Sequence, residues 1–386
     1  MIEKKKQQEE IVQPDLRFKG YTEAWLPQKF SEVSDVVRGA SPRPISDAKW
    51  FSNNSDVGWL RIADVTEQNG RIHRLTQKLS VLGQQKTRVL YDPHLLLSIA
   101  ATVGKPLINY VKTGVHDGFL IFLNPKFNID FMFQQLELHK DIWRKYGQPG
   151  SQVNLNSNIV KNHKIFIPLL SEQEKISEFF KKIDSLIAKH TQKLELLKKL
   201  KKGYLQKIFS QELRFRGFTD SWQEHRFQEI FNYERPDKYI VSDTNYVKNG
   251  VPVLTANKSF TLGYTQEKDF YEKVPCIIFD DFTLDSKYVD FPFKVKSSAL
   301  KILNVKDSYD IRFAFELLNI TRIPKEGHSR HYISIVQKKK IFSPKTLEQG
   351  EIGNFCNTIY NLLTMNSKKL DTLKQTKRAY LQKMFI

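Results

Sequence analysis

Two segments of the sequence each occur twice along the chain, and this repeat constrains the fold more than any other feature. Residues 16–33 (LRFKGYTEAWLPQKFSEV) match residues 213–230 (LRFRGFTDSWQEHRFQEI) at eight of eighteen positions. Residues 165–209 match residues 341–385 at 19 of 45 positions. The inserts between them, roughly residues 34–160 and 231–335, share almost no sequence. A repeated frame with unlike inserts indicates a pseudo-two-fold molecule that performs one binding task at two places with two specificities.

Composition narrows the class of protein. A chain of 386 residues with 40% hydrophobic and 12% aromatic content can fold into two or three domains with buried cores. Its apolar runs are shorter than the ~20 residues of a membrane span, and the first ten residues lack the apolar stretch of a secretion signal. The two cysteines, Cys276 and Cys356, have no metal-type or redox spacing. We therefore expect a cytoplasmic protein without membrane association.

The formal net charge of +19 indicates the kind of partner. Little of this charge comes from the N-terminal tail, where three lysines of residues 1–13 are balanced by three glutamates. Most of it is spread over the folded segments, together with many aromatic residues. This pattern favours a polyanion, and nucleic acid over acidic lipid, because lipid binding usually requires one basic amphipathic helix or a polybasic tail.

The second repeated segment predicts a long helix in each half, over residues 171–209 and its counterpart near the C-terminus. Apolar residues recur at spacings of three and four, as in the seam of a coiled coil. A seam this narrow suits a helix pair better than a helix that covers a domain core. Because the helices belong to one chain and are separated by a compact insert, we expect them to pair antiparallel. The predicted interface residues are Ile176, Phe179, Ile183, Leu186, Leu194, Leu197, Tyr204, Ile352, Phe355, Ile359, Leu362, Leu370, Leu373 and Tyr380.

Catalytic and metal-binding patterns are weak. The sequence has no Pro-Pro dipeptide, which methylation of the amino group of a flipped base would need, and no glycine-rich phosphate loop. Asp281 with Asp285 and Lys287 could suggest a Mg²⁺ site, but such a pattern arises easily by chance. His328 and His331 could face one metal, although no third ligand is evident. We therefore expect no catalytic residue, metal site or cofactor on this chain.

Sequence-specific DNA binding needs basic side chains on phosphates and polar side chains on base edges. In the first insert the loop Arg38–Pro44, with one glycine and two prolines, should hold Arg43 outward, towards a guanine edge or a phosphate. In the second insert Asn257 follows a strand-like run and could pair with adenine. The full set of expected DNA-binding residues is Arg38, Ser41, Arg43, Arg61, Arg71, His73, Arg74, Lys105, Asn257, Lys258, Ser259, Lys287, Arg330 and His331. Each of them could instead be an ordinary solvated side chain.

The order of these segments resembles the DNA-specificity subunit of type I restriction–modification enzymes. The residues that carry the resemblance are the L-R-F-[KR]-G-[YF]-T-[ED]-x-W openings, the E-Q-x-x-I helix starts and the K-x-x-Y-L-Q-K-[IM]-F endings. Within the inserts, GASPRP, WLRIADV and LLLSIAATVGKP look like one variety of target-recognition domain, and VPVLTANKS and IIFDDFT like another.

The resemblance implies a mixed α/β fold, with two α+β target-recognition domains separated by two long helices in an antiparallel coiled coil. The expected division is a tail at 1–15, recognition domains at 16–168 and 211–344, and spacer helices at 169–210 and 345–386. The implied partners are double-stranded DNA, two DNA-methyltransferase subunits and ATP-dependent restriction subunits. S-adenosylmethionine, ATP and Mg²⁺ are then expected on those partner subunits. Two other functions stay open at this point, a freestanding two-headed DNA-binding regulator and a structural scaffold.

Overall fold

The computed structural model describes residues 13–100, 102–146, 155–256, 259–324 and 331–386. The chain divides into two compact units, the first made of Met1–Lys189 with Leu370–Ile386 and the second of His190–Lys369. Each unit therefore contains part of both long helices, α6 (Leu170–Phe209) and α10 (Thr346–Met384). The predicted division into domains and separate spacer helices differs from this one, because the helices belong to the cores of both units. In the part of the chain that is described, no helix is long and apolar enough to cross a membrane.

The first unit is built around a mixed five-stranded sheet in the order β2-β9-β6-β7-β4, in which only the β7–β4 pair is parallel. Its strands are β2 (Asp35–Arg38), β9 (Phe119–Leu123), β6 (Leu95–Ser98), β7 (Pro106–Asn109) and β4 (Arg71–Ile72). Side chains alternate between the two faces, as the pleat of a strand requires. Leu95 and Leu97 join the core that includes the long helices, while Leu96 joins a separate core on the opposite face. Both faces of this sheet are therefore buried.

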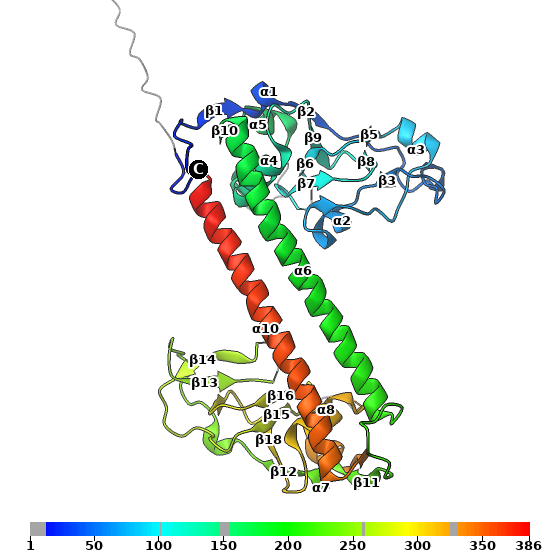
Figure 1. Cartoon of the computed structure of the whole chain (residues 1–386), viewed down its shortest axis with the longest axis vertical. Coiled ribbons are helices and arrows are strands. Elements are labelled where there is room, and N and C mark those ends of the chain that lie inside the picture. Colours follow the sequence, from blue (N-terminus) through cyan, green and yellow to red (C-terminus); the bar gives the residue numbers. More distant parts are fainter. Residues whose placement is uncertain (1–12, 101, 147–154, 257–258, 325–330) are drawn as a thin grey trace, which may run out of the picture. The chain divides into compact units, whose positions relative to one another are not determined.

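Smaller elements complete the first unit (Figure 1). β1 (Leu26–Lys29) pairs antiparallel with β10 (Lys164–Ile167) just before α6 begins. A three-stranded sheet has the order β3-β8-β5, with strands β3 (Gly58–Trp59), β8 (Thr113–Val115) and β5 (Arg88–Leu90). The short helices are α1 (Phe30–Val33), η1 (Ala48–Trp50), α2 (Ile62–Glu67), α3 (Val81–Gln85), α4 (Ile129–Leu138), η2 (Lys140–Tyr146) and α5 (Ser157–Asn162).

The second unit has an antiparallel four-stranded sheet in the order β12-β18-β15-β16. Alternation again separates two cores, with Ile277 and Phe279 on the face towards the long helices and Ile278 on the other. The strands of the four-stranded sheet are β12 (Phe231–Glu234), β18 (Leu300–Val305), β15 (Cys276–Asp280) and β16 (Ser286–Val289). A three-stranded sheet contains β14 (Thr261–Thr265), β13 (Val251–Leu254) and β17 (Lys294–Val295), and a separate pair contains β11 (Gln223–Arg226) and β19 (Lys340–Ser343). The short helices are α7 (Phe227–Ile230), η3 (Asp237–Tyr239), α8 (Ile311–Ile320), α9 (His331–Ser334) and η4 (Val336–Lys338).

The two repeated sequence segments contact each other at the start of each long helix. Arg17 donates two hydrogen bonds to Glu172 in the first turn of α6, at 2.9 and 2.6 Å. Arg214 makes the same bidentate pair with Glu348 in the first turn of α10, also at 2.9 and 2.6 Å. Acidic side chains are favourable at a helix N-terminus, and bidentate arginine–carboxylate pairs fix geometry. The repeated L-R-F and E-Q sequences therefore join the opening segment to the helix start in both units.

The glutamine of each E-Q sequence ties the helix start to a second helix. The Gln173 amide donates to the Pro168 carbonyl at 2.9 Å and accepts from the backbone of Asn128, the residue that caps α4. Gln349 donates to the Pro344 carbonyl at 2.8 Å and accepts from the backbone of Asp310, which caps α8. Both glutamine side chains are buried. The repeat thus positions α4 and α8 equivalently on their long helices.

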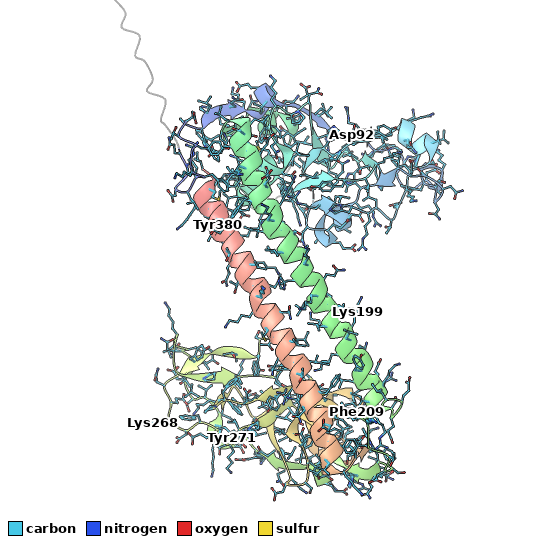
Figure 2. The ribbon with its side chains drawn as sticks, viewed as in Figure 1. Asp92, Lys199, Phe209, Lys268, Tyr271 and Tyr380 are labelled. Atoms are coloured by element: carbon cyan, nitrogen blue, oxygen red, sulfur yellow. The ribbon has the colours of Figure 1, made fainter. Side chains whose placement is uncertain are left out.

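Each unit is completed by the C-terminal end of one long helix packing against the N-terminal part of the other. In the first unit the Phe179 and Tyr380 rings lie 5.0 Å apart, and Lys377 contacts Asp184 at 2.7 Å. In the second unit the Tyr204 and Phe355 rings lie 5.5 Å apart. As the residue number on α6 increases, the number of the contacting residue on α10 decreases. The helices therefore run antiparallel, as predicted. Figure 2 marks Tyr380 near the end of α10 and Phe209 at the end of α6.

The predicted seam is correct at most positions and wrong at two equivalent ones. Leu186 and Leu362 are 45% and 41% exposed, whereas the next residues, Ile187 and Leu363, are half-buried. The next seam residue after Ile183 therefore lies four positions later, whereas the heptad pattern predicted a step of three. Tyr204, although 42% exposed, keeps its predicted contact through the edge of its ring. The remaining predicted seam residues are buried or half-buried.

Phe385 provides a test of how the end of α10 completes the first unit. It is 4% exposed and packs against Trp25, Phe131 and Phe180. We predict that Phe385→Ala lowers the free energy of unfolding by about 3 kcal/mol or more, because it leaves a cavity among aromatic rings. The measurement is urea unfolding of the full chain. Leu347→Ala is the control, because Leu347 is 81% exposed near the other end of the same helix and should leave stability unchanged. Equal stability of the two variants would contradict this account of the core.

Candidate nucleic-acid interface

The end of β2 and the loop that follows it bring three of the predicted DNA-binding residues onto one residue, Asp117. Ser41 donates to Asp117 Oδ1 at 2.7 Å, and Arg43 donates to Asp117 Oδ2 at 2.7 Å. Arg38 donates to the backbone carbonyl of Asp117. The Arg43 side chain is 72% exposed, so its guanidinium is held in place and still faces solvent. This loop is the best-organised part of the predicted interface.

Asp117 was not predicted from the sequence, although a signal for its position was present. It lies in His116-Asp117-Gly118 between β8 and β9, and an Asp-Gly pair between strand-like runs is typical of a tight turn. Burial opposes its ionisation, but the hydrogen bond from Ser41 and the charges of Arg43 and Arg38 together keep its pKa below the ordinary value. The carboxylate is therefore ionised at neutral pH.

Backbone contacts fix the loop on both sides of Arg43. Gly39 lies so close to the β8–β9 turn that a Cβ atom there would be 2.1 Å from the His116 carbonyl oxygen, so no other residue fits without movement. On the far side Trp50 Nε1 donates to the Pro44 carbonyl at 2.9 Å. The His116 ring packs near Trp59 and Phe119, and burial lowers its pKa. The His116 ring that supports the loop is therefore packed among aromatic rings and uncharged at neutral pH.

Arg61 and Arg74 remain on the surface of the first domain. Arg61 bonds Asp64 through Nε and Nη2 at the start of α2 and is 42% exposed. Arg74 pairs with Glu67, and both side chains are mostly exposed. The His73 ring stacks on Tyr110, with centroids 4.5 Å apart. Lys105 is half-buried in the connection between β6 and β7. Their predicted DNA contacts stay predictions.

Arg71 requires a correction, because the structure places it in a buried ionic network. Its side chain is 18% exposed, pairs with Asp130 on α4 and lies 3.5 Å from Asp184 on α6. The guanidinium also lies 4.5 Å above the centre of the Phe133 ring. Asp130 and Asp184 are further paired with Lys181 and Lys377, respectively. Arg71 therefore joins the first domain to the long helices, a role that accounts for its charge without DNA.

His331 requires the same correction in the second domain. It is 0% exposed, with Nδ1 2.8 Å from the backbone oxygen of Asp281. A side chain inside the core cannot reach a base edge. Lys287 is half-buried on β16, and Ser259 is exposed near β14. The other predicted residues of this domain, Asn257, Lys258 and Arg330, lie outside the described residues, as does His328.

Asp281 of the suspected Mg²⁺ site and its neighbour Asp280 are already bonded within the protein. Asp281 Oδ2 lies 3.2 Å from Lys301 Nζ, and its Oδ1 accepts from the backbone of Tyr332 at 2.8 Å. Asp280 Oδ1 accepts two backbone hydrogen bonds at the turn after β15. Among the described residues, no group of three or more His, Cys, Asp and Glu side chains is arranged to hold a metal ion. The Asp281–Lys301 pair is better explained as an anchor for the β15–β16 loop.

Comparison with known proteins finds similarity to type I specificity subunits. Residues 23–199 match the model of the type I restriction modification DNA specificity domain. The EcoR124I/EcoR124II specificity subunit of Escherichia coli is 43% identical over 124 residues, which cover 30% of this chain and 31% of that protein. The MjaVIII specificity subunit of Methanocaldococcus jannaschii is 23% identical over 348 residues, 79% of each chain. The chain is thus similar to type I specificity subunits, in its first half by the family model and over most of its length by the MjaVIII subunit.

The fold is shared with a solved type I S subunit. The S subunit of a type I restriction-modification system from M. genitalium superposes with a TM-score of 0.73 over 97% of this chain and 99% of that one. At 15% identity this likeness concerns the fold alone. These comparisons do not favour the freestanding regulator or the scaffold that the sequence had left open.

The buried Asp281–Lys301 pair can be tested by removing one partner. Both residues are about 2% exposed or less. We predict that Asp281→Ala lowers the free energy of unfolding by about 3 kcal/mol, because it leaves the Lys301 ammonium buried without a counter-charge. Asp285→Ala is the matched control in the same loop, where the side chain is exposed and the expected change is within about 0.5 kcal/mol. Chemical unfolding of both variants measures the difference, and similar losses would contradict a structural role specific to Asp281.

Proposed function

We propose that this chain is the specificity subunit of a type I restriction–modification enzyme. It binds double-stranded DNA, and each of its two α+β domains reads one half of a bipartite target. The observation that carries the proposal is the repeated frame around unlike domains: equivalent Arg–Glu and Gln contacts hold two different sheets on the same two helices. Such a molecule presents two recognition surfaces that cannot have the same sequence preference.

Electrostatics supports a polyanionic partner. The chain has a net charge of +19, and lysines lie exposed along α6, for example Lys199 (Figure 2). Exposed arginines in the first domain, such as Arg43, add groups that can bond phosphates or guanine. DNA affinity should therefore fall steeply as the salt concentration rises.

We infer that the chain positions chemistry that other subunits perform. The proposed partners are two DNA-methyltransferase subunits, which bring S-adenosylmethionine, and restriction subunits, which use ATP and Mg²⁺. This chain contributes recognition and no catalytic group. Both cysteines are unsuited to nucleophilic roles, because burial raises their pKa values to about 12.

The proposal predicts that recognition and catalysis separate between chains. The purified chain with S-adenosylmethionine should leave DNA unmethylated, and addition of the methyltransferase subunits should direct methylation to one asymmetric, bipartite sequence with a gap of fixed length. Sequencing of methylated bases in host DNA, with and without this gene, measures the result. A continuous or perfectly palindromic target, or methylation by the chain alone, would contradict the proposal.

The repeat also predicts that a half-length fragment can restore the frame as a dimer. In residues 1–211 the end of α6 carries Lys201, Leu205, Ile208 and Phe209, which match the residues that complete the first unit at the end of α10: Lys377, Leu381, Met384 and Phe385. Two fragments could therefore pair with closed two-fold symmetry. We expect sedimentation to show a dimer, which with the methyltransferase subunits should direct methylation to a palindrome of the first half-site. A fragment that stays monomeric at high concentration would show that the helix ends are not interchangeable.

A further inference from the structure

The position of Asp117 distinguishes two possible roles of Arg43. A phosphate contact needs only a cation, and a neighbouring carboxylate opposes it by repelling the phosphate. A guanine edge presents two neutral acceptors, O6 and N7, and needs a guanidinium held in one plane. Asp117 is 37% exposed beside Arg43, so a phosphate at Arg43 would lie near an ionised carboxylate. The geometry favours a base edge.

The loop has the rigidity that base recognition requires. Asp117 receives Ser41 on one carboxylate oxygen and Arg43 on the other, while Gly39 and Trp50 fix the backbone on either side. One Nη2 hydrogen of Arg43 is directed to Asp117, which leaves other N–H groups of the same planar fork for a bidentate contact. Groups that read bases must be held to within a fraction of an ångström by neighbours of their own.

We propose that Arg43 reads the guanine of a G·C pair in the major groove of the first half-site, and that Asp117 is the positioning residue that sets the direction of its guanidinium. This inference rests on the proposed function of the chain as a DNA-specificity subunit. A G·C pair suits the site on both strands, because the cytosine amino group is a donor that a carboxylate tolerates. Ser41 holds the other carboxylate oxygen of Asp117, and Arg38 holds its backbone carbonyl.

Conservative variants test the two roles while the fold is kept. Arg43→Lys retains the charge and loses the planar fork, and Asp117→Asn retains the shape and loses the charge. Arg88→Lys is the matched control, because Arg88 is an exposed arginine on β5 of the same domain and lies outside the expected DNA-binding set. Each variant is assembled with the methyltransferase subunits, and its affinity is measured on duplexes that carry the wild-type target with every single base-pair substitution. Discrimination at the second half-site reports in the same experiment that the complex is intact.

Arg43→Lys should reduce discrimination at one G·C pair of the first half-site about 10-fold, in line with the value of a bidentate contact. Asp117→Asn should relax the same position by a smaller factor, and Arg88→Lys should leave every position unchanged. Three results would overturn the inference: a first half-site without a G·C pair, unchanged discrimination in both Arg43→Lys and Asp117→Asn, or a uniform loss of affinity in Arg43→Ala with a salt slope lower by about one, as for a phosphate contact. If the wild-type complex preferred no bipartite sequence, the proposed function itself would fail, which is a separate outcome.

Discussion

The buried contact between the opening segment and the start of each long helix is the constraint on which the rest of the structure depends. Glu172 and Glu348 are 1% and 2% exposed, and such carboxylates are costly to bury without a partner. Arg17 and Arg214 satisfy them with two hydrogen bonds each. The paired residues are 155 and 134 positions apart, respectively, so each pair joins the two ends of a whole intervening domain. The repeat therefore specifies, besides the two helices, a long-range contact between each opening segment and a helix start.

Around this closure the two halves use the same chemistry for the frame and different chemistry for the domain. The second residue of α4 is Asp130, which pairs with Arg71 and Lys181. The second residue of α8 is Arg312, whose guanidinium lies 3.4 Å from the centre of the Tyr288 ring and 4.8 Å from that of Tyr360. The two residues occupy the same position in their helices but carry opposite charges. The domains therefore differ in how they attach to the helices as well as in their surfaces.

The sequence predicted the frame well because periodicity and repetition report on burial. Apolar spacing located both long helices, and the first, expected over residues 171–209, spans Leu170–Phe209 in the structure. The seam failed at Leu186 because one local step of four residues cannot be distinguished from a step of three when Leu186 and Ile187 are both apolar. Antiparallel pairing followed from chain connectivity and needed no contact information.

Individual site residues were harder to predict because charge in a sequence does not reveal burial. Arg71 and His331 looked like surface groups until the structure placed Asp130 beside one and the Asp281 backbone beside the other. Asp117 was missed for the opposite reason, since an acidic residue seems unfavourable in an interface for a polyanion. Asp117 lies 76 positions from Ser41 in the sequence, and only the fold brings the two side chains into contact. A carboxylate beside an exposed arginine reduces the non-specific attraction of that arginine to phosphate and also fixes the orientation of its guanidinium. The same carboxylate therefore weakens affinity for DNA of any sequence and strengthens the preference for one sequence.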